Sequence, residues 1–314
     1  MKEMIFKNKL TENCHASTVL PLHDGRVVAA WFAGTHEKCD DVDILTCVRT
    51  KDGWGEPARV SADSSVPHWN PVLFELTDGR IILFFKVGKK IPAWKTYFSL
   101  SEDGVNWSEP KELVPGDISG GRGPVKNKPI RLKSGRVIAP ASDERNKLWV
   151  CFADISDDDC KSWRRMRTVP TKSLKGFYVP MIQPTLWQSD DGAVHMLTRT
   201  SRGHIYRSDS FDEGETWCRA YRTKMPNNNS GIDLVRASNG NIYLVYNPVK
   251  KNWGERSPLD LAVSEDGGNT FRQLMRLESE KGEFSYPAIT ELDGTLHITY
   301  TYNREYIAYW RIEI

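Results

Sequence analysis

The stretch SFDEGETW, residues 210–217, has the residue order Ser-x-Asp-x-Gly-x-Thr-aromatic, so that a polar turn ends on a large aromatic side chain. The stretch SEDGGNTF, residues 264–271, repeats the whole order. Looser copies are SDDDCKSW (156–163), SEDGVNW (101–107) and TKDGW (50–54). The terminal aromatic residues are separated by steps of 53, 56, 54 and 54 residues. A fixed period of this length indicates a repeated structural unit.

A second, independent series of turns has nearly the same period. Asp-Gly, Asn-Gly or Ser-Gly dipeptides stand between apolar runs, as in LTDGRIILFF and ASNGNIYLVY. Such dipeptides are strong hairpin signals because their residues accept positive φ angles. The series predicts six β-hairpins, whose turn glycines are Gly25, Gly79, Gly135, Gly192, Gly240 and Gly294.

Six hairpins, five of them followed by a polar-aromatic turn, predict one all-β domain over residues 1–314. The period is typical of a six-bladed β-propeller of four-stranded antiparallel sheets. The final segment YIAYWRIEI is expected to be the third strand of the last blade, and the early segment MIFKNKL its fourth. Pairing between the two ends of the chain would close the ring and remove exposed sheet edges.

The polar-aromatic turns are predicted to be scaffold elements. Their Ser and Asp side chains can satisfy the backbone donors of the turn, while glycine accepts the unusual dihedral angles. The aromatic side chain can then pack in the groove between neighbouring sheets. We therefore expect Trp107, Trp163 and Trp217 to be largely buried at equivalent positions of successive blades.

Composition excludes several classes of partner. The net charge of +2 gives no electrostatic basis for binding nucleic acid or an anionic membrane. No segment approaches the roughly 18 consecutive apolar residues of a membrane span, and the amino-terminal stretch does not resemble a secretion signal. We expect a cytoplasmic protein whose six scattered cysteines are reduced thiols.

The repeat also predicts where a binding site lies. In each blade, the residues about seven to ten positions before the hairpin glycine begin the innermost strand, and each blade offers different polar groups there. Dissimilar polar groups on a shared ring are what a binding site needs. They are His15, His68, Asn70, Lys126, Lys128, Gln183, Asn229, Ser230 and Tyr286.

The loops after the second strands should surround the same mouth. They are rich in arginine and tryptophan, which suit a carboxylate and a sugar ring respectively. The candidates in these loops are Asp40, Asp41, Lys86, Trp94, Glu144, Arg145, Arg199, Arg202, Trp253, Arg256 and Arg304.

Through its repeats, the chain resembles the sialidase superfamily, whose Asp-box is S-x-D-x-G-x-T-W. Sialidases hold a sugar carboxylate with three arginines, and use an aspartate as acid/base and a tyrosine as nucleophile assisted by a glutamate. The resemblance implies that Asp40 is the acid/base, that Arg199 and Arg256 bind the carboxylate, and that Tyr286 is the nucleophile.

Two positions depart from the family pattern. The family's first arginine is replaced by His15, and its glutamate by Gln183. Gln183 cannot accept a proton from a tyrosine, whose unperturbed pKa is about 10. The sequence leaves open whether Glu144, Glu283 or Glu305 takes that role.

Three functions are compatible with these residues. The first is an exo-glycosidase that removes a terminal acidic sugar. The second is a lyase on a uronic acid, or an enzyme like the propeller enzymes that act on rhamnose–glucuronate linkages, with His15 and Tyr286 as base and acid. The third is a glycan-binding propeller without catalysis. All three predict an acidic oligosaccharide as partner.

The six residues predicted to lie nearest the chemistry are expected to meet in one pocket at the propeller axis, although they are far apart in sequence. They are Tyr286, Asp40, His15, Gln183, Arg199 and Arg256. Further substrate contacts are predicted at His68, Asn70, Lys128, Asn229, Arg304 and Trp94.

No cofactor and no metal are expected. The best ligand types near the site are Cys14, His15, His36 and Cys39, and they lack the spacing of a zinc motif.

Overall fold

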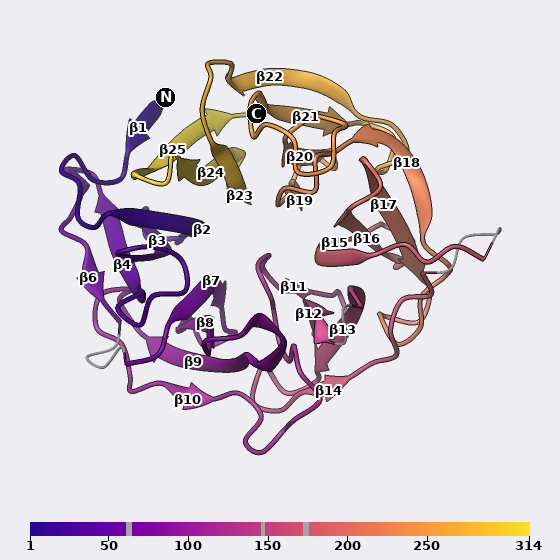
Figure 1. Cartoon of the computed structure of the whole chain (residues 1–314), viewed down its shortest axis with the longest axis horizontal. Coiled ribbons are helices and arrows are strands. Elements are labelled where there is room, and N and C mark those ends of the chain that lie inside the picture. The colour runs from indigo at the N-terminus through magenta and orange to yellow at the C-terminus, as the bar shows by residue number, and fades with distance from the viewer. Residues whose placement is uncertain (61–64, 146–147, 172–175) are drawn as a thin grey trace.

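The computed structural model describes residues 1–60, 65–145, 148–171 and 176–314, and it confirms the predicted propeller. Six antiparallel sheets are arranged as blades around a central axis (Figure 1). In each blade the first strand lies nearest the axis and later strands lie progressively further out. The one helical element is the 3₁₀ turn η1 (Ile91–Ala93) within the described ranges. None of the described segments forms a helix with the length and apolar character needed to span a bilayer.

The first three blades follow one another along the chain. Blade one contains β2 (Asn13–Pro21), β3 (Val27–Gly34), β4 (Asp43–Thr50) and β5 (Gly53–Trp54), and the short β6 (Ala58–Arg59) also pairs with β4. Blade two contains β7 (His68–Glu75), β8 (Ile81–Val87), β9 (Lys95–Ser101) and β10 (Lys111–Glu112). Blade three contains β11 (Ile130–Arg131), β12 (Val137–Asp143), β13 (Val150–Ser156) and β14 (Arg164–Arg165).

The last three blades complete the circle. Blade four contains β15 (Met181–Gln188), β16 (Val194–Thr200), β17 (His204–Ser210) and β18 (Tyr221–Pro226). Blade five contains β19 (Asp233–Arg236), β20 (Ile242–Tyr246), β21 (Leu259–Ser264) and β22 (Arg272–Glu278). Blade six contains β23 (Phe284–Leu292), β24 (Thr295–Tyr302), β25 (Tyr306–Glu313) and the amino-terminal β1 (Lys2–Met4).

The two ends of the chain meet in the sixth blade. β1 pairs antiparallel with β25, with Lys2 opposite Trp310 and Met4 opposite Ala308. Figure 1 shows these strands side by side near both termini. The paired strand covers residues 2–4, so most of the segment MIFKNKL follows the pairing rather than forming it. Because β1 hydrogen-bonds to β25, the outer edge of this blade is covered.

The polar-aromatic turns are held by their own side chains. In the turn 210–217, Ser210 Oγ donates to Asp212 Oδ1 at 2.8 Å and accepts from the Gly214 N–H at 2.9 Å. The Thr216 N–H donates to Asp212 Oδ1 at 2.9 Å. Gly214 has a φ of +86°, and a Cβ there would lie 2.7 Å from Ile138 of the preceding blade. Glycine is therefore required both by the dihedral angle and by the close approach of two blades.

The aromatic residues of these turns do pack between blades, but to different depths. Trp217 is 7% exposed, whereas Trp107 and Trp163 are half-buried. Trp107 instead donates from Nε1 to Thr46 Oγ1 of the preceding blade at 3.2 Å. Trp107 and Trp163 are less deeply buried than Trp217, and all three pack against the apolar core residues of the preceding blade.

One such turn predicts a pH dependence of stability. Hydrogen bonds from the Thr270 hydroxyl and N–H, and from Ser264, lower the pKa of Asp266 to about 2. The free carboxyl has a pKa of about 3.9, so this contribution is present above about pH 4 and lost as the pH falls through about 2. Thermal unfolding of the wild type and Asp266→Asn from pH 5 to 2 should show a stability difference that shrinks on acidification. A difference independent of pH would contradict this expectation.

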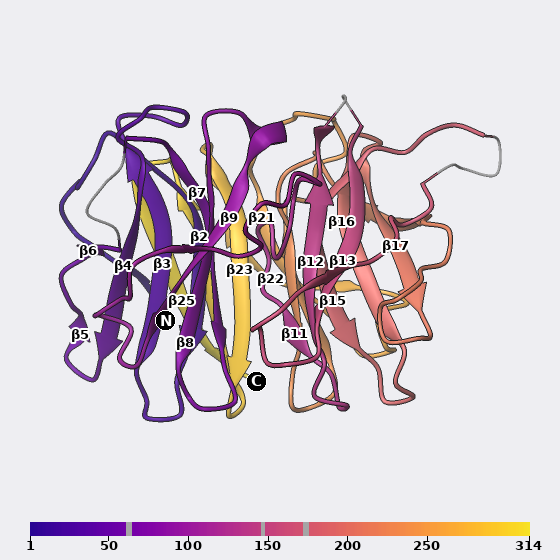
Figure 2. The ribbon, with the colours of Figure 1, turned by 90° about the horizontal axis from the view of Figure 1, so that it is seen from below.

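Four of the innermost strands contain a β-bulge that turns side chains toward the axis. β2, β7, β15 and β23 each carry a register shift close to their beginning. A non-glycine residue at this point has a left-handed backbone: Ala16, Asn70, Gln183 or Tyr286, with Asn229 equivalent before β19. Bulges of this kind re-aim side chains and are common beside functional sites. In Figure 2, β23 runs from the upper face of the propeller to its lower face. The bulge near the beginning of β23 therefore lies at the upper face.

Candidate functional site

Tyr286 lies at the centre of a cluster formed by blades four and six. Arg199 Nη1 donates to the Tyr286 hydroxyl oxygen at 2.9 Å and to Gln183 Oε1 at 2.8 Å. Gln183 Nε2 donates to the same Tyr286 oxygen at 3.3 Å. Tyr286 is half-buried, whereas Gln183 is 4% and Arg199 only 2% exposed. The two buried side chains therefore fix the position of a phenol oxygen that solvent can reach.

Arg199 is itself held from two further sides. Its Nε donates to Asn229 Oδ1 at 3.1 Å, and Asn229 Nδ2 donates to Asn252 Oδ1 at 3.1 Å. Its guanidinium carbon lies 5.8 Å from the ring centroid of Trp253, whose side chain is 60% exposed at the rim. Arg199 is thus a buried cation that is held by Gln183, Asn229 and Tyr286.

His15 packs against Tyr286 with its ring tilted by 44° and the ring centroids 4.3 Å apart. Burial lowers the pKa of His15 well below its usual value, and the positive charges of Arg304 and Arg256 act in the same direction. The imidazole is therefore neutral near pH 7. Its Nδ1 lies 2.8 Å from Thr301 Oγ1, which also accepts the Ala16 N–H at 3.2 Å.

The Thr301 contact defines the tautomer of His15. Within the described part of the chain, His15 Nδ1 is the one acceptor within hydrogen-bond distance of the buried Thr301 hydroxyl, so we assign the hydroxyl proton to this contact. The ring proton then resides on Nε2, because a neutral imidazole carries one proton. His15 consequently presents an N–H donor to its surroundings.

Two arginines from the neighbouring loops share one carboxylate. Arg256 Nη1 lies 2.6 Å and Arg304 Nε 2.9 Å from Glu283 Oε1, and Arg304 Nη1 lies 2.9 Å from Glu37 Oε2. The guanidinium carbon of Arg256 is 5.7 Å from the ring centroid of Tyr286. The Nη2 groups of Arg256 and Arg304 have no acceptor among the residues that the structure describes. They remain available for an anion.

The amine of Lys126 lies near the ring of Tyr286. Lys126 Nζ is 5.8 Å from the ring centroid of Tyr286 and donates to Asn127 Oδ1 at 2.8 Å and to the Pro287 carbonyl. Burial lowers the pKa of Lys126 to about 7, although the nearby Asp233 acts in the opposite direction. Tyr286 is therefore surrounded by Arg199, Arg256 and Lys126, an environment suited to a negatively charged ligand.

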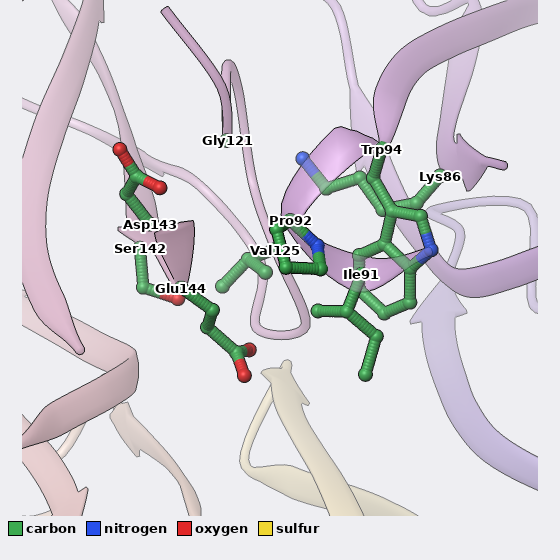
Figure 3. Close-up of a pocket in the computed structure, with 9 residues that line it drawn as sticks. All are labelled: Lys86, Ile91, Pro92, Trp94, Gly121, Val125, Ser142, Asp143 and Glu144. Atoms are coloured by element: carbon green, nitrogen blue, oxygen red, sulfur yellow. The ribbon is translucent and has the colours of Figure 1, made fainter. Parts of the chain in front are cut away.

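A pocket opens between blades two and three (Figure 3), and it adjoins this cluster through Ser142, whose Oγ accepts the Gln183 N–H at 3.3 Å. One wall is formed by Ile91, Pro92 and Trp94, and the opposite wall by Ser142 and the two acidic residues that follow it. At its base, Lys86 Nζ donates to Thr96 Oγ1 at 2.7 Å, and burial lowers the pKa of Lys86 to about 7.

Comparison with known proteins identifies the family to which this chain belongs. The family model of the BNR repeat-like domain matches residues 25–298, which is most of the chain. The chain belongs to the BNR repeat-like domain family. No curated protein sequence matches this BNR repeat-like chain.

Solved structures resemble the BNR repeat-like chain in fold. A protein of unknown function from Dyadobacter fermentans has a TM-score of 0.79 at 16% identity, covering 100% of this chain and 98% of its own. The Hadza microbial sialidase Hz136 has a TM-score of 0.81 at 15% identity, covering 100% of this chain and 68% of its own. The intramolecular trans-sialidase from Ruminococcus gnavus has a TM-score of 0.74 at 15% identity, covering 100% and 97%. These similarities establish a sialidase-like propeller fold.

The structure of this BNR repeat-like protein places several predicted residues away from Tyr286. Asp40 lies on the surface, with its side chain 54% exposed and Oδ2 2.7 Å from Lys89 Nζ. Trp94 packs against Trp69, with ring centroids 4.9 Å apart. Neither residue has a described contact with the tyrosine cluster.

Three other predicted substrate-binding residues contact protein groups between blades. His68 Nδ1 lies 2.9 Å from Asp43 Oδ1, Asn70 Nδ2 donates to the Val125 carbonyl at 3.0 Å, and Lys128 Nζ lies 3.0 Å from Asp233 Oδ2. These three side chains link different parts of the ring: His68 joins blade two to β4 of blade one, Asn70 joins blade two to the segment before β11, and Lys128 joins that segment to β19 of blade five.

Sequence reasoning gave no role to some residues that organise this BNR repeat-like site. Thr301 sets the tautomer of His15, and Asn252 supports Asn229. The sequence suggested only a role as a base for Glu283, whereas in the structure its carboxylate forms ion pairs with both Arg256 and Arg304. The only sequence feature that pointed to Glu283 was its position as a polar residue directly before the innermost strand β23. No sequence feature pointed to Thr301.

Proposed function

We propose that this protein is an exo-acting glycosidase that removes a terminal carboxylate-bearing sugar, of the sialic or uronic acid class, from an oligosaccharide. The observation that carries the proposal is the half-buried Tyr286 hydroxyl, held by Arg199 and Gln183 beside two arginines with unpaired N–H groups. The names of the structural neighbours Hz136 and the Ruminococcus gnavus trans-sialidase support the same class of chemistry.

Arg256 and Arg304 are the proposed carboxylate ligands. Their side chains are 20% and 23% exposed, and Glu283 holds both in place through ion pairs. Arginine binds carboxylates through two parallel N–H groups, which fixes the orientation of the sugar as well as its charge. Arg199 is a positioning residue in this scheme, because it is buried and already donates to Tyr286.

Tyr286 is proposed to contact the anomeric carbon. When the glycosidic bond breaks, positive charge develops on the sugar ring, and a fixed oxygen beside that carbon stabilises it. The two donors on Tyr286 keep the phenol oxygen in one place, so its reorganisation during the reaction is small.

Elimination on a uronic acid is the second candidate, because His15 packs directly against Tyr286. In this chemistry a base removes the proton beside the carboxylate. The His15 tautomer presents N–H rather than a lone pair at Nε2, which favours hydrolysis over a lyase with His15 as base.

Product analysis on a panel of sialylated and uronic-acid oligosaccharides tests the proposal. Release of the intact acidic sugar is the expected result. An unsaturated, ultraviolet-absorbing product would establish elimination instead. Binding to the panel without any product would establish a non-catalytic glycan-binding protein and overturn the proposal.

Replacing Arg256 by lysine should lower kcat/KM by roughly 10- to 100-fold, since a charge-assisted hydrogen bond contributes about 1.5–3 kcal/mol. Lysine keeps the charge but loses the planar fork. Arg272→Lys is the matched control, because Arg272 is 58% exposed on an outer strand and pairs with Glu265. Equal kcat/KM in both variants, measured on the released sugar, would exclude Arg256 as a substrate ligand.

A further inference from the structure

Glu144 has an unusual position beside the tyrosine cluster. It is the first residue after β12, and its half-buried side chain lines the pocket of Figure 3. The figure shows its carboxylate directed into the space opposite Ile91, away from Asp143 and Gly121. The residue therefore offers its carboxyl group to whatever fills this pocket.

The carboxyl group of Glu144 is unpaired, in contrast to its neighbour. Asp143 is bound by Arg145 Nη2 at 2.7 Å and by Arg165 Nη2 at 3.3 Å. Glu144 has neither a hydrogen bond nor an ion pair to any residue in the described ranges. A half-buried acidic side chain without a partner is costly to keep ionised, so its presence at this point suits proton transfer.

The charged groups around Glu144 come from three blades. Asp143 adjoins it on β12, Lys86 lies on β8 at the base of the pocket, and Arg199 lies on β16 within electrostatic range. Burial raises the pKa of Glu144, and the charge of Asp143 raises it further, whereas Arg199 lowers it. Burial is the largest of these effects, so the acid form persists to higher pH than in a free glutamate.

Arg199 connects Glu144 to the proposed reaction centre. The guanidinium of Arg199, whose charge acts on Glu144, donates to the Tyr286 oxygen at 2.9 Å. The family's acid/base position, Asp40, is occupied by an exposed carboxylate paired with Lys89 at 2.7 Å. Asp40 has no described contact with Tyr286 or with the residues that hold it.

We infer that Glu144 is the proton donor to the leaving glycosidic oxygen, a role that rests on the proposed glycosidase function. As the bond between the anomeric carbon and this oxygen breaks, its electron pair goes to the oxygen, which takes the proton of Glu144. The Glu144 carboxylate then accepts a proton from the water whose oxygen bonds to the anomeric carbon. One water is consumed, and Glu144 returns to its acid form.

The test compares two leaving groups on the same acidic sugar. Wild type, Glu144→Gln and Asp40→Asn are assayed on an oligosaccharide and on the 4-nitrophenyl glycoside, prepared for both sialic and glucuronic acid. Nitrophenolate needs little protonation to leave, whereas a sugar alkoxide needs a full proton. Glu144→Gln should lower kcat/KM on the oligosaccharide by about 10²- to 10³-fold and on the nitrophenyl glycoside by less than about 10-fold.

The pH profile gives an independent readout. Activity that depends on protonated Glu144 falls as the pH rises through its pKa, so the variant should lose the alkaline limb of the wild-type profile. Asp40→Asn should behave as the wild type on both substrates. Equal losses of Glu144→Gln on both substrates, or leaving-group dependence in Asp40→Asn, would overturn the assignment while hydrolysis stands. An inactive wild type would overturn the proposed function, and the assignment with it.

Discussion

The Tyr286→Phe protein is expected to fold normally and to turn over its acidic oligosaccharide on the order of 10³-fold more slowly. The substitution removes the oxygen that accepts from Arg199 and Gln183. It keeps the ring that packs against His15 at a centroid distance of 4.3 Å and lies beside Arg256. The chemical step should therefore be lost while packing is retained. Release of the acidic sugar measures kcat, and thermal unfolding measures stability.

Tyr221→Phe is the matched control for this variant. Its hydroxyl also makes a hydrogen bond, to Asp209 Oδ2 at 2.8 Å, but Tyr221 is 44% exposed on the outer strand β18. Its kcat should equal that of the wild type. A Tyr286→Phe protein with full activity would remove Tyr286 from the reaction, and one that fails to fold would assign it a structural role.

Trp217→Ala is expected to lower the free energy of unfolding by about 3–5 kcal/mol, the usual result of emptying a large buried aromatic site. Trp217 is 7% exposed and packs with Ile138 and Ile155 of blade three and Met196 of blade four. Its Nε1 also donates to the Gly214 carbonyl at 3.1 Å. Removal of the indole leaves a cavity between blades three and four, and the melting temperature should fall by roughly 10 °C.

Trp253→Ala provides the comparison, since this indole is 60% exposed on a rim loop. Its melting temperature should stay within about 2 °C of the wild type, because surface substitutions have small effects on stability. If Trp217→Ala kept its melting temperature and lost activity, the polar-aromatic turn would have a functional rather than a structural role.

The sequence predicted the scaffold because the signals of the scaffold are local. In the turn 264–271, Ser264 and Asp266 hold the N–H groups of Gly268 and Thr270, all within a few residues. Such turns depend only on residues that are close together in sequence. Their spacing along the chain, together with that of the hairpins, therefore predicted six blades. Left-handed residues at the bulges were not foreseen, although they lie at nearly constant distances before the hairpin glycines.

The candidate site was predicted in its residue types and only partly in its arrangement. Periodicity correctly put Gln183 and Tyr286 at the beginnings of innermost strands, and the structure joins them across 103 residues of sequence. The same reasoning treated Arg199 and Arg256 alike. In the folded protein Arg199 is buried beneath Trp253, whereas Arg256 is partly exposed beside Glu283.

By itself, the sequence determined the number of blades, the order of their strands and the face on which polar groups gather. Only the tertiary structure decided that Asp40 pairs with Lys89, that Glu283 joins Arg256 to Arg304, and that Glu144 is left without a partner. The physical reason is the range of the interactions. Turns and strands are set by hydrogen bonds between close neighbours in sequence, whereas the partners of a charged side chain depend on which blades closure of the ring brings together.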